Sequence, residues 1–115
     1  MMGHYRFWTT WENIMSKAVR HVKRFLLTLT ELSKSQQKFL LKTITKQQLL
    51  GLRELVTNLL AGNIAVSDKQ LKKLKKYRLF LRKLAKKTVS KSTLQKYYNI
   101  IVLFVQVIQP FLDAL

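Results

Sequence analysis

The residues of this chain best suited to chemistry are basic, and they are concentrated in one segment. Between Ser67 and Lys91 there are 11 Lys and Arg residues and a single acid, Asp68. A helix surface stabilised by its own ion pairs alternates acidic and basic residues. This segment is almost entirely basic, which favours binding to a negatively charged partner. Lysines outnumber arginines nine to two, which favours diffuse phosphate neutralisation over two-pronged reading of base edges. The segment therefore predicts polyanion binding without sequence preference.

We expect ten of these side chains to contact the phosphates of a nucleic acid, DNA more than RNA. They are Lys69, Lys72, Lys73, Lys75, Lys76, Arg78, Arg82, Lys83, Lys86 and Lys87. Solubility alone is the simpler explanation of such a run, and the stretch from Lys72 to Arg78 also has the composition of a nuclear localisation patch. Tyr77 and Phe80 lie between the cations and could stack on bases, but packing is the stronger expectation for both.

Catalysis finds no support in the remaining polar residues. The five acids, Glu12, Glu31, Glu54, Asp68 and Asp113, are scattered, and neither His4 nor His21 has a partner at metal-ligand spacing. Cysteine is absent, which excludes disulfides and thiolate metal sites and suits an intracellular protein. We therefore expect no enzyme activity, no metal and no cofactor.

The whole chain has the size and composition of one folded domain. It has 115 residues, a net charge of +17 and 48% hydrophobic residues, far more than a disordered basic tail would have. Three zones follow one another: an aromatic and basic start (1–34), a helical middle with a basic helix over 68–87 (35–91), and an apolar end (92–115).

Helix starts are marked by Ser or Thr followed three residues later by Glu or Gln, the capping-box pattern. The pattern occurs at Thr9, Thr28, Thr45, Ser67 and Ser92, and we expect the Thr28 match to lie in a turn. With apolar periodicity, it predicts helices over residues 10–27, 36–44, 46–61, 68–87 and 93–109. Gly62 and Pro110 are expected to end two of them. The predicted fold is all-α, a compact bundle of four to five helices.

The basic helix has one narrow apolar seam through which we expect it to pack. The seam consists of Leu71, Leu74, Tyr77, Leu81, Leu84 and Ala85. The rest of its circumference is cationic.

The last predicted helix is apolar on nearly all sides, so it is either the central core helix or a surface for a partner. Candidate partner contacts are Tyr98, Ile101, Phe104, Val105 and Ile108. A membrane span is a weak interpretation because Asn99, Gln106, Gln109 and Pro110 leave fewer than the roughly 18–20 apolar residues required. A buried strand has no convincing second strand to pair with.

The middle of the chain resembles a known family. An apolar helix ending in Leu59-Leu60-Ala61-Gly62-Asn63-Ile64 is followed by Ser67-Asp68-Lys69-Gln70-Leu71-Lys72-Lys73-Leu74-Lys75-Lys76-Tyr77 and by Leu81-Arg82-Lys83-Leu84-Ala85. This order, over about residues 40–91, is similar to small basic proteins of polinton-like and adintovirus-like DNA elements, which have been likened to the adenovirus core protein X. The resemblance implies DNA packing inside a virion, with residues 67–87 on the phosphates. Relatives of that kind continue with basic residues and a glycine-containing tail, whereas this chain ends in an apolar segment.

Two other functional classes remain open. One is a protein-interaction module or viral accessory inhibitor that binds an acidic protein. The apolar end could also bind a capsid protein or a second copy of the chain. The other is a membrane-active basic protein. Non-enzymatic, non-sequence-specific DNA binding in the nucleus or a virion is the leading expectation.

Overall fold

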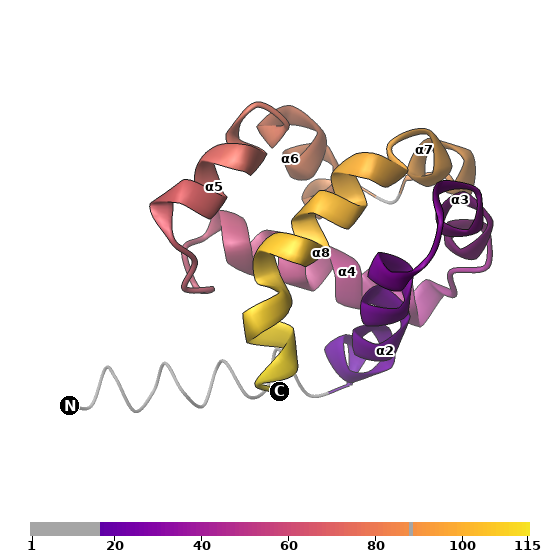
Figure 1. Cartoon of the computed structure of the whole chain (residues 1–115), viewed down its shortest axis with the longest axis horizontal. Helices are drawn as coiled ribbons and strands as arrows, with labels where there is room; N and C mark the ends of the chain where they lie inside the picture. Colours follow the sequence, from indigo (N-terminus) through magenta and orange to yellow (C-terminus); the bar gives the residue numbers. More distant parts are fainter. Residues whose placement is uncertain (1–16, 88) are drawn as a thin grey trace.

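The computed structural model describes residues 17–87 and 89–115, which form seven α-helices and no strand (Figure 1). The helices are α2 (Ala18–Glu31), α3 (Lys34–Lys42), α4 (Lys46–Leu60), α5 (Asp68–Lys75), α6 (Arg78–Lys86), α7 (Lys91–Lys96) and α8 (Tyr98–Asp113). The all-α class is confirmed. The predicted count of four to five was too low because two predicted helices are each divided in two.

Hydroxyl side chains begin four of the helices, and two of these caps, Thr45 and Ser67, were predicted. Ser33 and Thr45 each accept a hydrogen bond from the amide three residues on, and the glutamine there accepts one from the amide of the cap. Ser67 caps α5 through the amide of Gln70. Ser90, two residues before the predicted Ser92, caps the helix that follows it.

Two other boundaries differ from the predictions, and one prediction is not tested. α3 begins at Lys34, two residues before the predicted start at Gln36, because Ser33 is its cap. Thr28 lies inside α2, not in a turn, since that helix continues to Glu31. The predicted cap at Thr9 and the start of the first predicted helix lie outside the described residues.

The core is formed by apolar faces of α2, α4 and α8, which pack against the remaining helices. α2 contacts both α4 and α8, with Val22 and Leu26 fully buried between them. Gly51 of α4 allows the closest approach: a Cβ built there would lie 2.7 Å from the carbonyl carbon of Ala18 and 2.9 Å from Cγ1 of Val22. The α2–α4 contact therefore requires a residue without a side chain.

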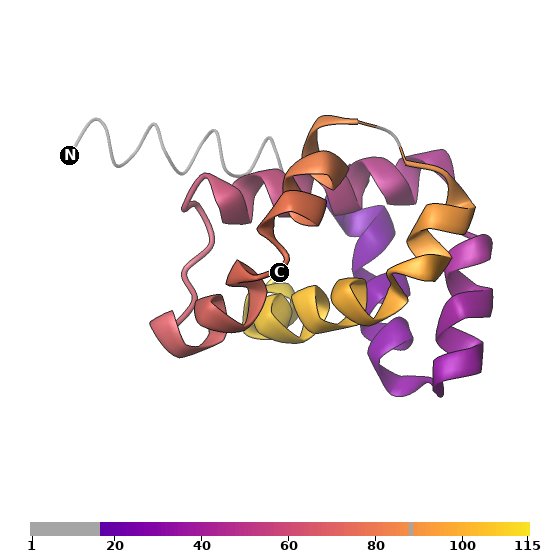
Figure 2. The ribbon, with the colours of Figure 1, turned by 90° about the horizontal axis from the view of Figure 1, so that it is seen from above.

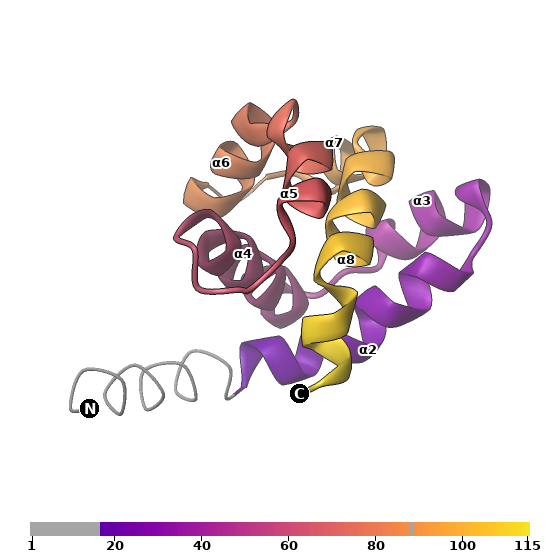
Figure 3. The same ribbon diagram turned by 60° about the vertical axis from the view of Figure 1, so that its left-hand side comes forward.

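α8 is the central helix. It runs through the middle of the bundle, beside α2 and α5 (Figure 3). Pro110 does not end it, which corrects the sequence prediction; the helix continues to Asp113. Continuation is favoured because Leu112 is fully buried, so the last turn contributes to the core.

The predicted basic helix over 68–87 breaks into α5 and α6 at Lys76 and Tyr77. Neither residue is Gly or Pro, so tertiary packing is the cause of the break. α5 packs on α8, whereas α6 packs on α4. A straight helix of this length would span about 30 Å and could not follow both supports.

A second break, at Tyr97, divides the predicted last helix in the same way. α7 packs on α3, and α8 turns away into the core. Figures 1 and 2 show the result: α3 and α7 lie together at one end of the bundle, and α5 and α6 lie towards the other.

Gly62 follows α4 with φ of 79°, the left-handed conformation predicted for a helix end. Across residues 17–87 and 89–115, no helix has the length and apolarity needed to cross a membrane.

Candidate nucleic-acid interface

All ten predicted phosphate-contacting residues lie on the α5–α6 pair, and all ten are exposed. Four are on α5, four are on α6, and Lys76 and Lys87 are the residues at the two helix C-termini. The structure thus places them on, or at the ends of, two consecutive helices. We call this set of ten side chains the α5–α6 cationic surface.

The charges of this surface are not neutralised within the described part of the chain. Asp68, in the first turn of α5, is the one acid on these two helices. None of the ten cations forms an ion pair with any described residue. Lys76 alone has a ring contact, its Nζ lying 5.2 Å from the centre of the Tyr77 ring. The cations are therefore available to an outside anion.

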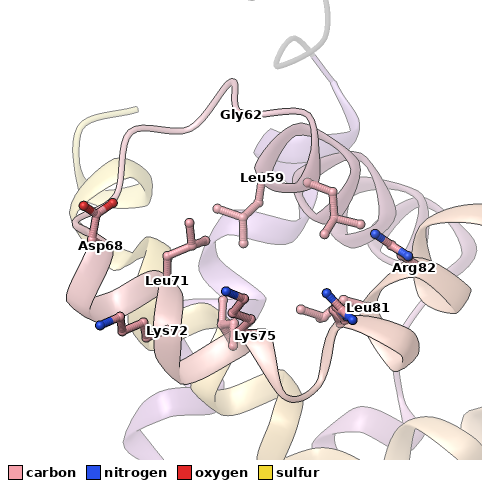
Figure 4. Close-up of a pocket in the computed structure, with 11 residues that line it drawn as sticks. Leu59, Gly62, Asp68, Leu71, Lys72, Lys75, Leu81 and Arg82 are labelled. Carbon is pink, nitrogen blue, oxygen red and sulfur yellow. The ribbon is translucent and has the colours of Figure 1, made fainter.

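Buried leucines hold the two helices in place, so the cations project from a fixed support. Leu74, Leu81 and Leu84 are each at most 2% exposed. Leu71 departs from the predicted seam, since 44% of its surface is exposed. It points into the space between α5 and α4 instead of the core (Figure 4).

The aromatic residues among the cations pack against the protein, as the sequence favoured. Tyr77 and Phe80 are half-buried against the core. The Phe80 ring is tilted against that of Tyr97, with 4.6 Å between their centres. The Phe80 ring is therefore partly covered by Tyr97.

α6 is also tied to α4 by a polar contact, in which Nη2 of Arg53 donates to the carbonyl oxygen of Ala85 at 3.4 Å. The neighbouring Glu54 is half-buried, and its Oε2 has no hydrogen-bond partner among the described residues. Burial raises the pKa of the Glu54 carboxyl group above its ordinary value. Nothing in the sequence indicated that Glu54 would be partly buried, because the five acids of the chain are scattered and form no motif.

A pocket of about 550 Å³ lies between the C-terminus of α4 and the α5–α6 pair (Figure 4). Its lining consists of Leu59, Leu60, Gly62, Asp68, Leu71, Lys72, Leu74, Lys75, Arg78, Leu81 and Arg82. The sequence did not reveal it, because the pocket exists only where α5 and α6 diverge at the unpredicted break.

Four of the five predicted partner contacts lie in the core instead of on the surface. Ile101, Phe104, Val105 and Ile108 are each at most 1% exposed. A partner could contact them only if the fold opened, so this part of the prediction is corrected in favour of a core helix. Tyr98 is half-buried, and Nζ of Lys38 lies 5.0 Å from its ring centre.

The described residues contain no group of three or more His, Asp or Glu side chains placed to hold a metal ion. Comparison with known proteins finds no family that matches this chain, no curated protein that resembles it and no solved structure that matches it.

Proposed function

We propose that this protein binds nucleic acid, duplex DNA in particular, through the α5–α6 cationic surface and without sequence preference. The observation that supports the proposal is the set of ten exposed cations, none paired with an acid among the described residues, on two helices that are anchored to the core. Phosphate contacts by such a surface release condensed counterions from DNA, which provides binding free energy independent of sequence.

Lack of sequence preference follows from the residue types. Eight of the ten cations are lysines, whose ammonium groups act as point charges. The planar side chains of Arg, Asn and Gln suit the two-pronged contacts that read base edges in the major groove better than the point charge of Lys does. Arg78 and Arg82, the two arginines of the surface, also line the pocket beside α4.

The biological role we propose is DNA packing, in the manner of a virus-like core protein, in the nucleus or a virion. A protein of net charge +17 offsets many phosphates per chain, which suits condensation better than regulation at a defined site. No catalytic step belongs to this role.

The experiment is duplex-DNA binding across a salt series, with the natural chain beside a variant in which Lys72, Lys73, Lys75 and Lys76 are changed to Gln. Log affinity should fall steeply and linearly with log salt for the natural chain. The variant's slope should be shallower by about 0.9 for each phosphate that it no longer neutralises, at most about 3.6 for four. DNAs of unrelated sequence should give the same affinity.

A matched control separates the surface from net charge alone. Lys17, Lys34, Lys42 and Lys46 are also exposed lysines, but they lie outside α5 and α6. Changing these four to Gln removes the same charge and should leave most of the slope intact. Equal reductions of the slope in the two variants would show that binding follows overall charge, and no binding near ~50 mM salt, where screening is weak, would contradict DNA binding altogether.

A binding site for an acidic protein predicts a different result. The protein would then form a complex of fixed stoichiometry that survives nuclease treatment, and its DNA affinity would be low even at reduced salt.

A further inference from the structure

The pocket beside α4 has an apolar interior. Five leucines line it, and they divide into a deep and a shallow group. Leu59, Leu74 and Leu81 are at most 6% exposed, whereas Leu60 and Leu71 are 42% and 44% exposed. Two half-exposed leucines facing a hollow are surface that a ligand could cover, because burying apolar area is favourable.

Cations surround this apolar interior. Lys72 and Lys75 belong to α5, and Arg82 belongs to α6 (Figure 4). Arg78, the first residue of α6, also lines the pocket. Asp68 is the one acid in the lining. The pocket thus presents four positive charges against one negative charge at the edge of an aliphatic hollow.

The chemistry of the lining selects an aliphatic ligand over a nucleobase. No aromatic side chain lines the pocket, so a base would find no ring to stack on. Apart from the charged groups, the lining side chains have no hydrogen-bonding atoms that could read a base edge. A hydrocarbon chain needs neither, and the volume of about 550 Å³ is within the usual range of small-molecule sites.

We propose that this pocket binds a single-chain lipid with a phosphate monoester head group, such as a lysophosphatidate. The acyl chain lies against the leucines, and the head group lies among Lys75, Arg78 and the other rim cations. A phosphate monoester carries about −1.5 to −2 charge at neutral pH, which matches the excess of cations on the rim better than a carboxylate does. Two arginines provide two-pronged contacts to phosphate oxygens.

The site does not depend on DNA binding, but the two share residues. The four rim cations all belong to the α5–α6 cationic surface. A bound lipid phosphate would neutralise part of that surface, so lysophosphatidate should compete with DNA if both bind. Direct lipid binding tests the pocket even if the protein has no affinity for DNA.

The test is calorimetric titration of the whole protein with lauroyl lysophosphatidate below its micelle concentration. Glycerol phosphate serves as the head group without the chain, and lauroyl lysophosphatidylcholine serves as the chain with a neutral head. We expect saturable binding of one lysophosphatidate per chain, at least about tenfold tighter than either comparison ligand. Comparable binding of glycerol phosphate would overturn the role of the leucines, and comparable binding of lysophosphatidylcholine would overturn the role of the rim.

Paired variants test the location. Leu71→Trp fills the pocket from a half-exposed position, whereas Leu79→Trp adds the same ring to a residue that is 75% exposed and outside the lining. The first should weaken lysophosphatidate binding about tenfold or more, and the second should leave it within about twofold. Equal affinity of the two variants would contradict the site.

Charge variants complete the comparison. The double change Lys75→Gln and Arg82→Gln removes two rim cations, and Lys73→Gln with Lys83→Gln removes two exposed cations of the same helices that do not line the pocket. We expect the first pair to weaken lysophosphatidate binding about tenfold and the second about twofold or less. Equal weakening by both pairs would mean that a general cationic surface, not the pocket, attracts the lipid.

Discussion

Gly51→Ala is the substitution whose effect on stability the fold predicts most sharply. Gly51 is a buried residue of α4, and a Cβ there would fall within contact distance of the carbonyl oxygen of Ala18. It would also lie 2.7 Å from the Ala18 carbonyl carbon, where ordinary contacts begin at 3.4 Å. α2 would therefore have to move by at least about 0.7 Å, and its backbone cannot rotate aside as a side chain can.

Two effects of opposite sign determine how much Gly51→Ala changes the free energy of unfolding. Replacing glycine by alanine inside a helix is worth about 1 kcal/mol of stability from propensity alone. Forcing an extra methyl group into a packed contact typically costs about 1–3 kcal/mol, and backbone contact places this case at the upper end. The expected net result is a loss of about 1–2 kcal/mol in the free energy of unfolding. For a domain of this size the midpoint of thermal unfolding should fall by roughly 4–8 °C.

The assay is thermal and urea unfolding followed by circular dichroism, with Gln47→Ala as the control on the same helix. Gln47 is exposed, so its replacement should change stability by less than about 0.5 kcal/mol. A Gly51→Ala protein more stable than the natural chain would show that propensity dominates and that α2 and α4 do not approach as closely as described.

Three further predictions concern stability. Gly62→Ala should lower the free energy of unfolding in urea by about 1–2 kcal/mol, because φ at this residue is 79° and an alanine is strained there even though nothing lies near its Cβ position. Gly62→Asn should lower it by less, since asparagine tolerates this conformation better. Equal losses would contradict the left-handed conformation. Gln37→Met should cost about 1 kcal/mol in the same assay, since the buried Nε2 donates to the carbonyl oxygen of Leu29 at 3.1 Å; no loss would mean that water replaces the bond. Because burial raises the pKa of Glu54 in the folded state, its protonation favours folding. The contribution of Glu54 to stability is therefore fully present below its unfolded pKa and is lost as pH rises through its folded pKa. Glu54→Gln should therefore stabilise the protein at pH ~7 and flatten the decline in stability that begins above the ordinary carboxyl pKa. A variant whose stability in urea unfolding declines with pH as steeply as that of the natural chain would refute this.

The all-α class could be predicted because its signals are local. Capping hydroxyls at Thr45 and Ser67 begin helices as predicted, and Gly62 ends one. The exposure of all ten cations was also predictable, since charged side chains on a helix with one apolar seam have no other place to lie.

The breaks at Tyr77 and Tyr97 could not be predicted, because no Gly or Pro marks them. They arise where successive turns pack on different neighbours: α5 on α8, then α6 on α4. The pocket depends on the first break, so it was equally invisible in the sequence. Pro110 illustrates the converse case, in which burial of Leu112 outweighs a local helix-ending signal.

Amide chemical-shift mapping during titration with a short DNA duplex tests the central claim most directly. The account predicts that the largest shifts and line broadening in the described residues fall on α5 and α6, from Asp68 to Lys87, and are the same for duplexes of unrelated sequence. Shifts concentrated at the opposite end of the bundle, on α3 and α7, or absent at low salt, would contradict the assignment of the α5–α6 cationic surface as the DNA site.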